Sequence, residues 1–220
     1  EALLDYRRQP TMIYDVFCHA WDESVPPMQE QFDIVRFDGC DKQPLCCRNK
    51  GDFDAFMERI NEPLPAYRVK MRPRKIVYGP IMDEKPAVLG DGGELVYDGE
   101  ASGDAVTLIG CVSAPKGYPI AGEYGEAAAE VIVEYEGGEQ RFELRNGMEF
   151  TTVFTTLCSS RIMPRAQFAT PYAEFHYDKN FENYLINRLD LPLGESRTLK
   201  RVRIRSLSKG YGLLFYGVYV

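Results

Sequence analysis

The residues best suited to binding a ligand gather in one stretch, residues 165–177, which mixes aromatic rings with hydrogen-bonding side chains. Aromatic planes bury the C–H faces of a ligand, and planar polar groups fix its orientation. An ordinary ordered loop has a similar composition, so both interpretations stand. If the chain has a ligand site, this irregular, aromatic stretch is its first candidate. The candidate ligand-binding residues in it are Arg165, Tyr172, Glu174, His176 and Tyr177.

A further candidate is Tyr118, which lies in a Pro- and Gly-rich segment that leads toward Tyr124. The Tyr118 ring could stack on a ligand face while the ammonium of Lys116 donates to it. Two prolines, Pro115 and Pro119, restrict the backbone on either side. The preferred interpretation is therefore a rigid turn, with Tyr118 packed over the edge of a sheet.

Three arginines, Arg201, Arg203 and Arg205, alternate with apolar residues. Because side chains alternate sides along a strand, the arginines share one face. Such a stripe could bind an anion or an acidic glycan. The preferred interpretation is that it pairs with acidic side chains across the sheet. The acids expected to pair with it are Glu130, Glu134 and Glu143.

Catalytic arrangements have less support in the sequence. Two of these glutamates could flank a glycosidic bond, as glycoside hydrolysis requires, but they alternate on strands that face solvent. His176 could act as a general base, yet no Ser or Cys lies in a recognisable nucleophile motif. The glycine-rich residues 90–93 form a turn with no helix after it to receive a phosphate. No catalytic residue and no cofactor is predicted, and a non-enzymatic role is preferred while an enzymatic one stays open.

The six cysteines do not form a disulfide framework by their spacing. Cys46 and Cys47 are adjacent, and no pair has C-x-x-C spacing. This pattern favours free thiols in a reducing compartment. Cys111 and Cys158 lie in apolar strand surroundings and are expected in the core. No metal is predicted, because the only candidate zinc ligands have no standard spacing. Those ligands would be Cys18, His19, Cys40 and Cys46.

The composition narrows the range of partners. The formal net charge of −7 disfavours nucleic acid, because nothing offsets the repulsion of phosphates over the whole surface. No apolar run approaches the ~18 residues that a membrane span needs, so no membrane partner is expected. The chain begins Glu-Ala-Leu-Leu, with neither an initiator Met nor a signal peptide. Its start is therefore expected to be processed, or the chain to be part of a longer one.

Residues 1–64 are predicted to form an N-terminal appendage with one amphipathic helix. Phe32–Phe37 alternates and predicts a strand. Asp52–Ile60 predicts a helix with Asp52 as its N-cap and one apolar stripe. The stripe must dock on the β domain, on a neighbouring domain or on a second copy of the chain. The members of the stripe are Phe53, Phe56, Met57 and Ile60.

Residues 65–220 are predicted to form one all-β domain, because short strand patterns alternate with turns about every ten residues. Gly137-Gly138 and Asn146-Gly147 are predicted hairpin turns. The final strand, residues 211–220, is aromatic, β-branched and almost uncharged, so it is expected at the centre of a sheet, buried on both faces. The other predicted strands are 67–71, 75–78, 94–97, 106–112, 129–135, 140–145, 148–154, 183–193 and 198–206.

A family resemblance begins at about residue 105. A Gly/Pro/Tyr loop is followed by Ala-x-Val-x-Val-x-Tyr-x-Gly-Gly from Ala129 and by a return strand that ends in Arg-Asn-Gly-x-Glu. Pro171-Tyr-Ala, Asn183-Tyr-Leu-Ile and Leu199-Lys-x-Val-x-Ile-x-Ser come next, and the chain closes on Leu-x-Tyr-Gly-Val-x-Val. Residues ~105–220 resemble the galactose-binding-domain-like β-jelly roll, found as accessory modules on bacterial glycoside hydrolases and other carbohydrate-active proteins. Residues 1–64 have no counterpart in that module.

The resemblance implies a β-sandwich jelly roll that binds a glycan without catalysing a reaction. The alternative is a structural domain that forms homo-oligomers, or docks on a neighbouring domain, through residues 1–64. If the chain belongs to an enzyme, the resemblance implies an accessory region of a glycoside hydrolase. Localisation stays open, since the unpaired cysteines favour the cytoplasm and a glycan-degrading role would favour secretion.

Overall fold

The computed structural model describes residues 32–36, 41–56, 85–113, 124–151, 154–155, 166–177, 183–209 and 211–220. Within these residues, ten strands form one sheet in which every strand pair is antiparallel. The all-β class predicted from the sequence is confirmed. No helix in the described parts of the chain is long and apolar enough to cross a membrane.

The strands follow one another along the whole described chain. They are β1 Phe32–Arg36, β2 Cys46–Cys47, β3 Ala87–Leu89, β4 Glu94–Ser113, β5 Ala127–Tyr135, β6 Gly138–Arg145, β7 Phe154–Thr155, β8 Thr170–Tyr177, β9 Asn183–Ser206 and β10 Gly212–Tyr219.

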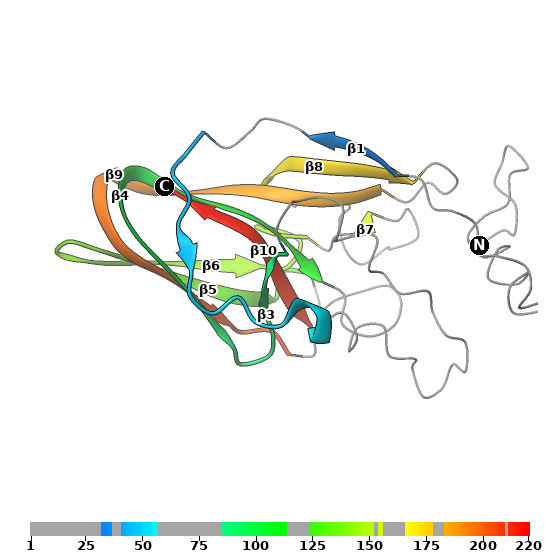
Figure 1. Ribbon diagram of the computed structural model, residues 1–220, viewed down its shortest axis with the longest axis horizontal. Coiled ribbons are helices and arrows are strands. Elements are labelled where there is room, and N and C mark those ends of the chain that lie inside the picture. The colour runs from blue at the N-terminus through cyan, green and yellow to red at the C-terminus, as the bar shows by residue number, and fades with distance from the viewer. Residues whose placement is uncertain are drawn as a thin grey trace, which may run out of the picture.

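Two long strands, β4 and β9, form the centre of the sheet. They have 20 and 24 residues and pair with each other through both of their halves. The register shifts between Asp98 and Ala101 and again between Gly103 and Ala105. Figure 1 shows the two strands curving over together at one end of the molecule. The sheet therefore folds back on itself while the β4–β9 ribbon continues through the bend.

The bend divides the sheet into two layers. In the β10 layer, the second half of β4 and the first half of β9 lie in the order β1–β8–β9–β4–β10–β3. In the β5 layer, the other halves lie in the order β6–β5–β9–β4–β2. One hydrophobic cluster takes residues from both layers, including Leu95 and Val202 from the β5 layer and Leu108 and Leu213 from the β10 layer. The chain is thus a β-sandwich-like protein with its core between the layers.

The closing strand lies where the sequence predicted it. β10 pairs with β3 on one side and β4 on the other. Leu213, Leu214 and Phe215 are consecutive and buried, so both faces of the strand are covered. An apolar run without alternation is typical of such a strand.

Two predicted breaks between strands are wrong. The predicted strands 183–193 and 198–206 form the single strand β9, and 94–97 and 106–112 form the single strand β4. Gly194 lies inside β9 with a φ of 83°. Because glycine has no Cβ, the chain turns there at little steric cost and pairing resumes beyond it.

The segment predicted as the appendage contributes strands to this sheet. β1 pairs with β8, and β2 pairs with β4. A helical turn covers residues 53–56, and the Asp52 carboxylate accepts the N–H of Ala55 at 3.0 Å, which confirms the predicted N-cap. Phe53 and Phe56 are buried, and the Phe56 ring lies against Gly212 of β10. Part of the predicted stripe therefore docks on the β-sheet of its own chain.

Some predictions fall outside the described residues. These are the strands at 67–71 and 75–78, the end of the predicted helix at 57–60, and the loop residues 114–123.

Gly194→Ala is expected to lower the free energy of unfolding by about 1 kcal/mol, because an L-residue with a Cβ is strained at this positive φ. A Cβ at residue 194 would meet nothing within 4 Å, so the loss of stability would come from backbone strain and not from a steric clash. Urea unfolding followed by circular dichroism measures it. Gly194→Asn should lose less, since Asn tolerates this conformation better. Ser196→Ala, an exposed neighbour, is the matched control, and an equal loss in Ser196→Ala and Gly194→Ala would contradict the assignment.

Candidate functional site

The first predicted site stretch is mostly a strand, so the prediction of an irregular segment is wrong from Thr170 onward. β8 covers Thr170–Tyr177 and lies between β1 and β9. Pro171 argues against a strand because proline lacks an N–H, but it lies beside a register shift, a position where proline is tolerated. Tyr172 occupies that shift and is partly buried.

The other predicted residues are not all placed by the structure. Glu174, His176 and Tyr177 occupy positions of β8 opposite Val35, Asp33 and Phe32 of β1. Tyr118 and Arg165 lie outside the described residues. Tyr172, Glu174, His176 and Tyr177 thus lie on one strand, and the role of the six residues in ligand binding stays a prediction.

The best-defined candidate site is a group of residues that combines two members of the predicted stretch 165–177 with residues from the ends of two other segments. Tyr124 is 44% exposed and Phe168 is 53% exposed. The Tyr124 hydroxyl donates to Oε1 of Gln167 at 3.3 Å, and the Arg145 guanidinium carbon lies 5.8 Å from the centre of the Phe168 ring. We call Tyr124, Arg145, Glu149, Gln167 and Phe168 the aromatic cluster.

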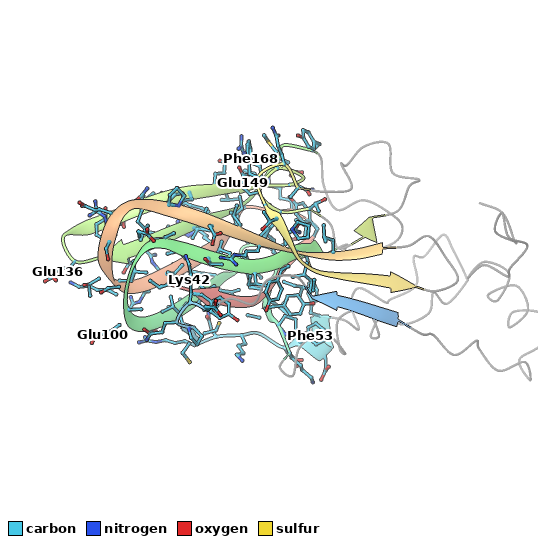
Figure 2. The ribbon with its side chains drawn as sticks, turned by 90° about the horizontal axis from the view of Figure 1, so that it is seen from above. Lys42, Phe53, Glu100, Glu136, Glu149 and Phe168 are labelled. Carbon is cyan, nitrogen blue, oxygen red and sulfur yellow. The ribbon has the colours of Figure 1, made fainter. Side chains whose placement is uncertain are left out.

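The aromatic cluster joins the two layers of the sandwich. Phe168 precedes β8 of the β10 layer, and its N–H donates to the carbonyl of Met148, just after β6 of the β5 layer, at 2.9 Å. Figure 2 shows Phe168 and Glu149 at one edge of the molecule, away from Glu100 and Glu136 near the bend. The cluster therefore lies away from the end at which β4 and β9 connect the layers.

A tight turn after β6 supports the cluster. The Gly147 N–H donates to the Phe150 carbonyl at 2.6 Å, and Gly147 has a φ of 79°. A Cβ on Gly147 would come within 2.6 Å of the Tyr124 ring. Glycine is thus required at this position both by the backbone conformation and by the ring that lies over it.

This turn also corrects the predicted strand at 148–154. Residues 147–149 form a turn, and the next strand in the described chain is β7, Phe154–Thr155. The reason is Glu149, whose buried carboxylate accepts the Arg145 N–H at 2.8 Å and thereby folds the chain back on the end of β6. The turn predicted at Asn146-Gly147 is present, but it does not lead into a second hairpin strand.

Glu149 also fixes the Arg145 side chain. The Arg145 guanidinium donates through Nε at 3.1 Å and through Nη2 at 2.6 Å to the two oxygens of Glu149. These hydrogen bonds raise the pKa of Arg145 above its usual value. A paired fork of this kind restricts the guanidinium to one orientation and neutralises its charge locally.

The chemistry available at the aromatic cluster is binding. Two partly exposed rings offer apolar faces, while Gln167 and Arg145 offer polar groups beside them. No group of three or more His, Cys, Asp or Glu side chains in the described chain could hold a metal ion. Of the zinc ligands considered from the sequence, Cys46 is an exposed free thiol, and Cys18, His19 and Cys40 lie outside the described residues.

The predicted basic stripe is paired with acids on the outward face of the β5 layer. Arg203 Nε lies 2.7 Å from Glu134, and Arg205 lies 3.7 Å from Glu130, which confirms two of the predicted partners. Arg201 instead contacts Asp98 at 3.0 Å, an acid on β4 that the sequence interpretation did not include. This pairing leaves the stripe less charge with which to bind an anion.

The described cysteines match their expected states. Cys111 is fully buried, and burial raises the pKa of its thiol. Cys46 and Cys47 are free, and burial is also the main reason that the pKa of Tyr97, which lies opposite Cys47, is raised well above its usual value. Cys158 lies outside the described residues.

Sequence reasoning missed Phe168, Arg145 and Glu149 as site residues. One local signal was present: Arg145 and Glu149 are four residues apart across Asn-Gly, the spacing of an acid that closes a turn. Nothing local marked Phe168 as exposed, because its exposure depends on how β8 and the turn after β6 meet.

The fold and the cluster together define a β-sandwich-like protein with an exposed aromatic surface beside a neutralised arginine. No protein-family model matches the sequence, and neither a curated protein nor a solved structure matches it.

Glu149→Ala is expected to lower the free energy of unfolding by about 2 kcal/mol, because the backbone N–H of Arg145 loses its acceptor in a part-buried place. Glu149→Gln keeps an acceptor and should lose less. Chemical denaturation measures both variants. Glu136→Ala, at an exposed hairpin residue, is the control and should stay within about 0.5 kcal/mol of the wild type. Equal stability of Glu149→Ala and wild type would show that the carboxylate does not hold the turn.

Cys46 should react with iodoacetamide in the folded protein, whereas Cys111 should react only after unfolding. Cys46 is exposed, while Cys111 is fully buried and its raised pKa further lowers its thiolate fraction. Peptide mass mapping before and after denaturation distinguishes the two thiols. Rapid native labelling of Cys111 would contradict its placement in the sheet.

Proposed function

We propose that this protein is a non-catalytic carbohydrate-binding module, accessory to a carbohydrate-active protein, and that its two-layered sheet is a jelly-roll sandwich. The antiparallel strands and the bend shared by β4 and β9 support this kind of fold. The family resemblance of residues ~105–220 supplies the ligand class. The aromatic cluster supplies the surface on which such a ligand would bind.

The observation that carries the proposal is the pair of exposed rings next to Gln167: Tyr124, which is hydrogen-bonded to it, and Phe168, which follows it in the chain. Sugar rings present flat faces of C–H groups with hydroxyls around the rim. Aromatic faces cover the C–H groups, and the Gln167 amide and the Arg145 guanidinium can hydrogen-bond the hydroxyls. The mechanism is shallow recognition with no covalent step.

The cluster is held in position before any ligand arrives. Tyr124 lies over Gly147, the Phe168 N–H is bonded to Met148, and Arg145 is fixed by Glu149. Groups that are already ordered lose less conformational entropy on binding. A small surface with few contacts can therefore still give measurable affinity.

The alternative function, assembly through residues 1–64, has less support in the described part of that segment. Phe53 and Phe56 are buried within their own chain, and β1 and β2 pair with β8 and β4. Phe53 and Phe56 therefore have little area left for a second chain.

Isothermal titration calorimetry with a panel of oligosaccharides tests the proposal. Tyr124→Ala and Phe168→Ala should each weaken binding of a glycan ligand by about fivefold or more, since stacking on a ring is worth about 1 kcal/mol or more. Tyr135→Ala is the control, because Tyr135 lies at the other end of β5 and stacks with Arg197. Circular dichroism confirms folding of each variant.

An absence of binding to every sugar in the panel and on a glycan array would overturn the proposal. Binding that is lost in Tyr172→Ala but kept in Tyr124→Ala would place the site along β8, as the sequence predicted.

A further inference from the structure

Strand β6 is an edge of the β5 layer with an ordered pattern of charge. It has eight residues, and in the described chain it pairs with β5 alone. Its inward face carries Phe142, partly buried, and Leu144, fully buried. Because side chains alternate, its outward face carries Glu139, Arg141, Glu143 and Arg145 in turn.

Rows of charge cross the outward face of the β5 layer and end at this strand. One row runs Glu94, Arg205, Glu130, Glu143, and its first three members alternate in sign. The Arg205 guanidinium lies 3.6 Å from Glu94 and 3.7 Å from Glu130. The alternation fails at the last step, where Glu143 lies opposite Glu130, acid against acid.

A second row fails in the same way. It runs Asp98, Arg201, Glu134, Glu139, and again the last two members are acids in register on β5 and β6. Like charges directly opposite each other destabilise a sheet. A cation on the far side of β6 would give the last acid of each row an opposite charge beside it.

The row between them ends in a cation. It runs Val96, Arg203, Ile132, Arg141. Ile132 is fully buried although it is on the outward face, with an arginine in register on either side of it. The aliphatic parts of arginine side chains cover apolar surface in this way. Arg141 already contacts Glu130 and Glu139, at 3.2 and 2.7 Å, and an acid beyond β6 would continue the row.

Strand β6 itself carries the side chains that all three rows lack. If β6 pairs antiparallel with β6 of a second copy so that the two Phe142 residues lie opposite each other, then Arg141 lies opposite Glu143. In the same register, Glu139 lies opposite Arg145. Each contact occurs twice because the arrangement is two-fold symmetric. Every outward charge of the strand then has an opposite charge across the edge.

Other registers do not have this property. Placing Arg141 opposite its own copy puts Glu139 opposite Glu143, and placing Glu143 opposite its own copy puts Arg141 opposite Arg145. A shift that changes parity would bring Phe142 and Leu144 onto the same face as the charges. Among registers centred on the middle of β6, one is complementary.

We propose that β6 is a dimerisation edge, on which a second copy of this chain adds its own β6 and extends the β5 layer into one continuous sheet. Charged residues on an edge strand normally prevent pairing. Here the same charges prevent mismatched pairing and favour one self-complementary register. This edge shares only Arg145 with the aromatic cluster. The inference rests on the charge pattern of β6 and does not depend on carbohydrate binding.

Sedimentation equilibrium of the 220-residue chain tests the inference. The wild type should form a dimer at concentrations up to about 100 µM. Glu143→Arg should weaken dimerisation by at least about tenfold, because it places arginine opposite arginine twice. It also places a cation opposite Glu130, so the loss would not come from unfolding. Arg141→Glu should weaken dimerisation to a similar extent.

The double variant Arg141→Glu/Glu143→Arg is the decisive arm, since it restores an opposite pair at both positions and should restore dimerisation. Glu100→Arg, an exposed residue near the bend, changes the net charge equally and should leave the dimer unchanged. A monomeric wild type would overturn the proposal. A dimer insensitive to both single changes, or not restored by the double change in a folded protein, would overturn it as well.

Discussion

The pairing of β4 with β9 is the interaction on which the rest of the structure depends. It supplies the centre of both layers, because one half of each strand lies in each layer. All other described strands except β1, β3 and β6 pair directly with one of these two, and those three pair with a strand that does. The bend at Gly194 and the register shifts in β4 fold this two-stranded ribbon over, so that it runs through both layers of the sandwich.

The two ends of the sandwich have different properties as a result. At the bend, the backbone itself joins the layers, and the β5–β6 hairpin is tied to β9 there by the Glu136 N–H, which donates to the Thr198 carbonyl. Away from the bend, the layers are joined by contacts such as Phe168 with Met148 and Val112 with Thr151. Loops supported by a rigid scaffold in this way commonly carry function. The aromatic cluster occupies such a position, and the paired charges of the β5 layer occupy the flat face between the two ends.

Local patterns predicted two elements whose partners are close in sequence and the closing strand, whose partners are distant. The β5–β6 hairpin, the Asp52 cap and the buried closing strand follow from turn residues, a capping side chain and an apolar run. The failures at β8 and at β4 and β9 come from tertiary context, whereas the failure at residues 147–149 comes from a local contact. β8 is a strand despite Pro171, residues 147–149 turn because of Glu149, and β4 and β9 run unbroken because each is the other's partner. The loops around Tyr124 and Gln167 were marked in advance, but their meeting with Phe168 and Arg145 depends on strands from both layers.

The large sequence separation between β4 and β9 has a consequence for the synthesis and folding of the chain. Arg201 contacts Asp98 across a separation of 103 residues. Closing such a loop costs entropy before any contact compensates for it, so folds dominated by distant pairings form slowly. During synthesis, residues 94–113 must leave the ribosome long before their partner, residues 183–206, exists. Until then Leu95, Val106 and Leu108, all buried in the finished protein, have no strand to cover them. The nascent chain therefore presents the apolar side chains of the twenty-residue segment β4 without their cover until the C-terminal third emerges, and such exposed surface is prone to aggregation.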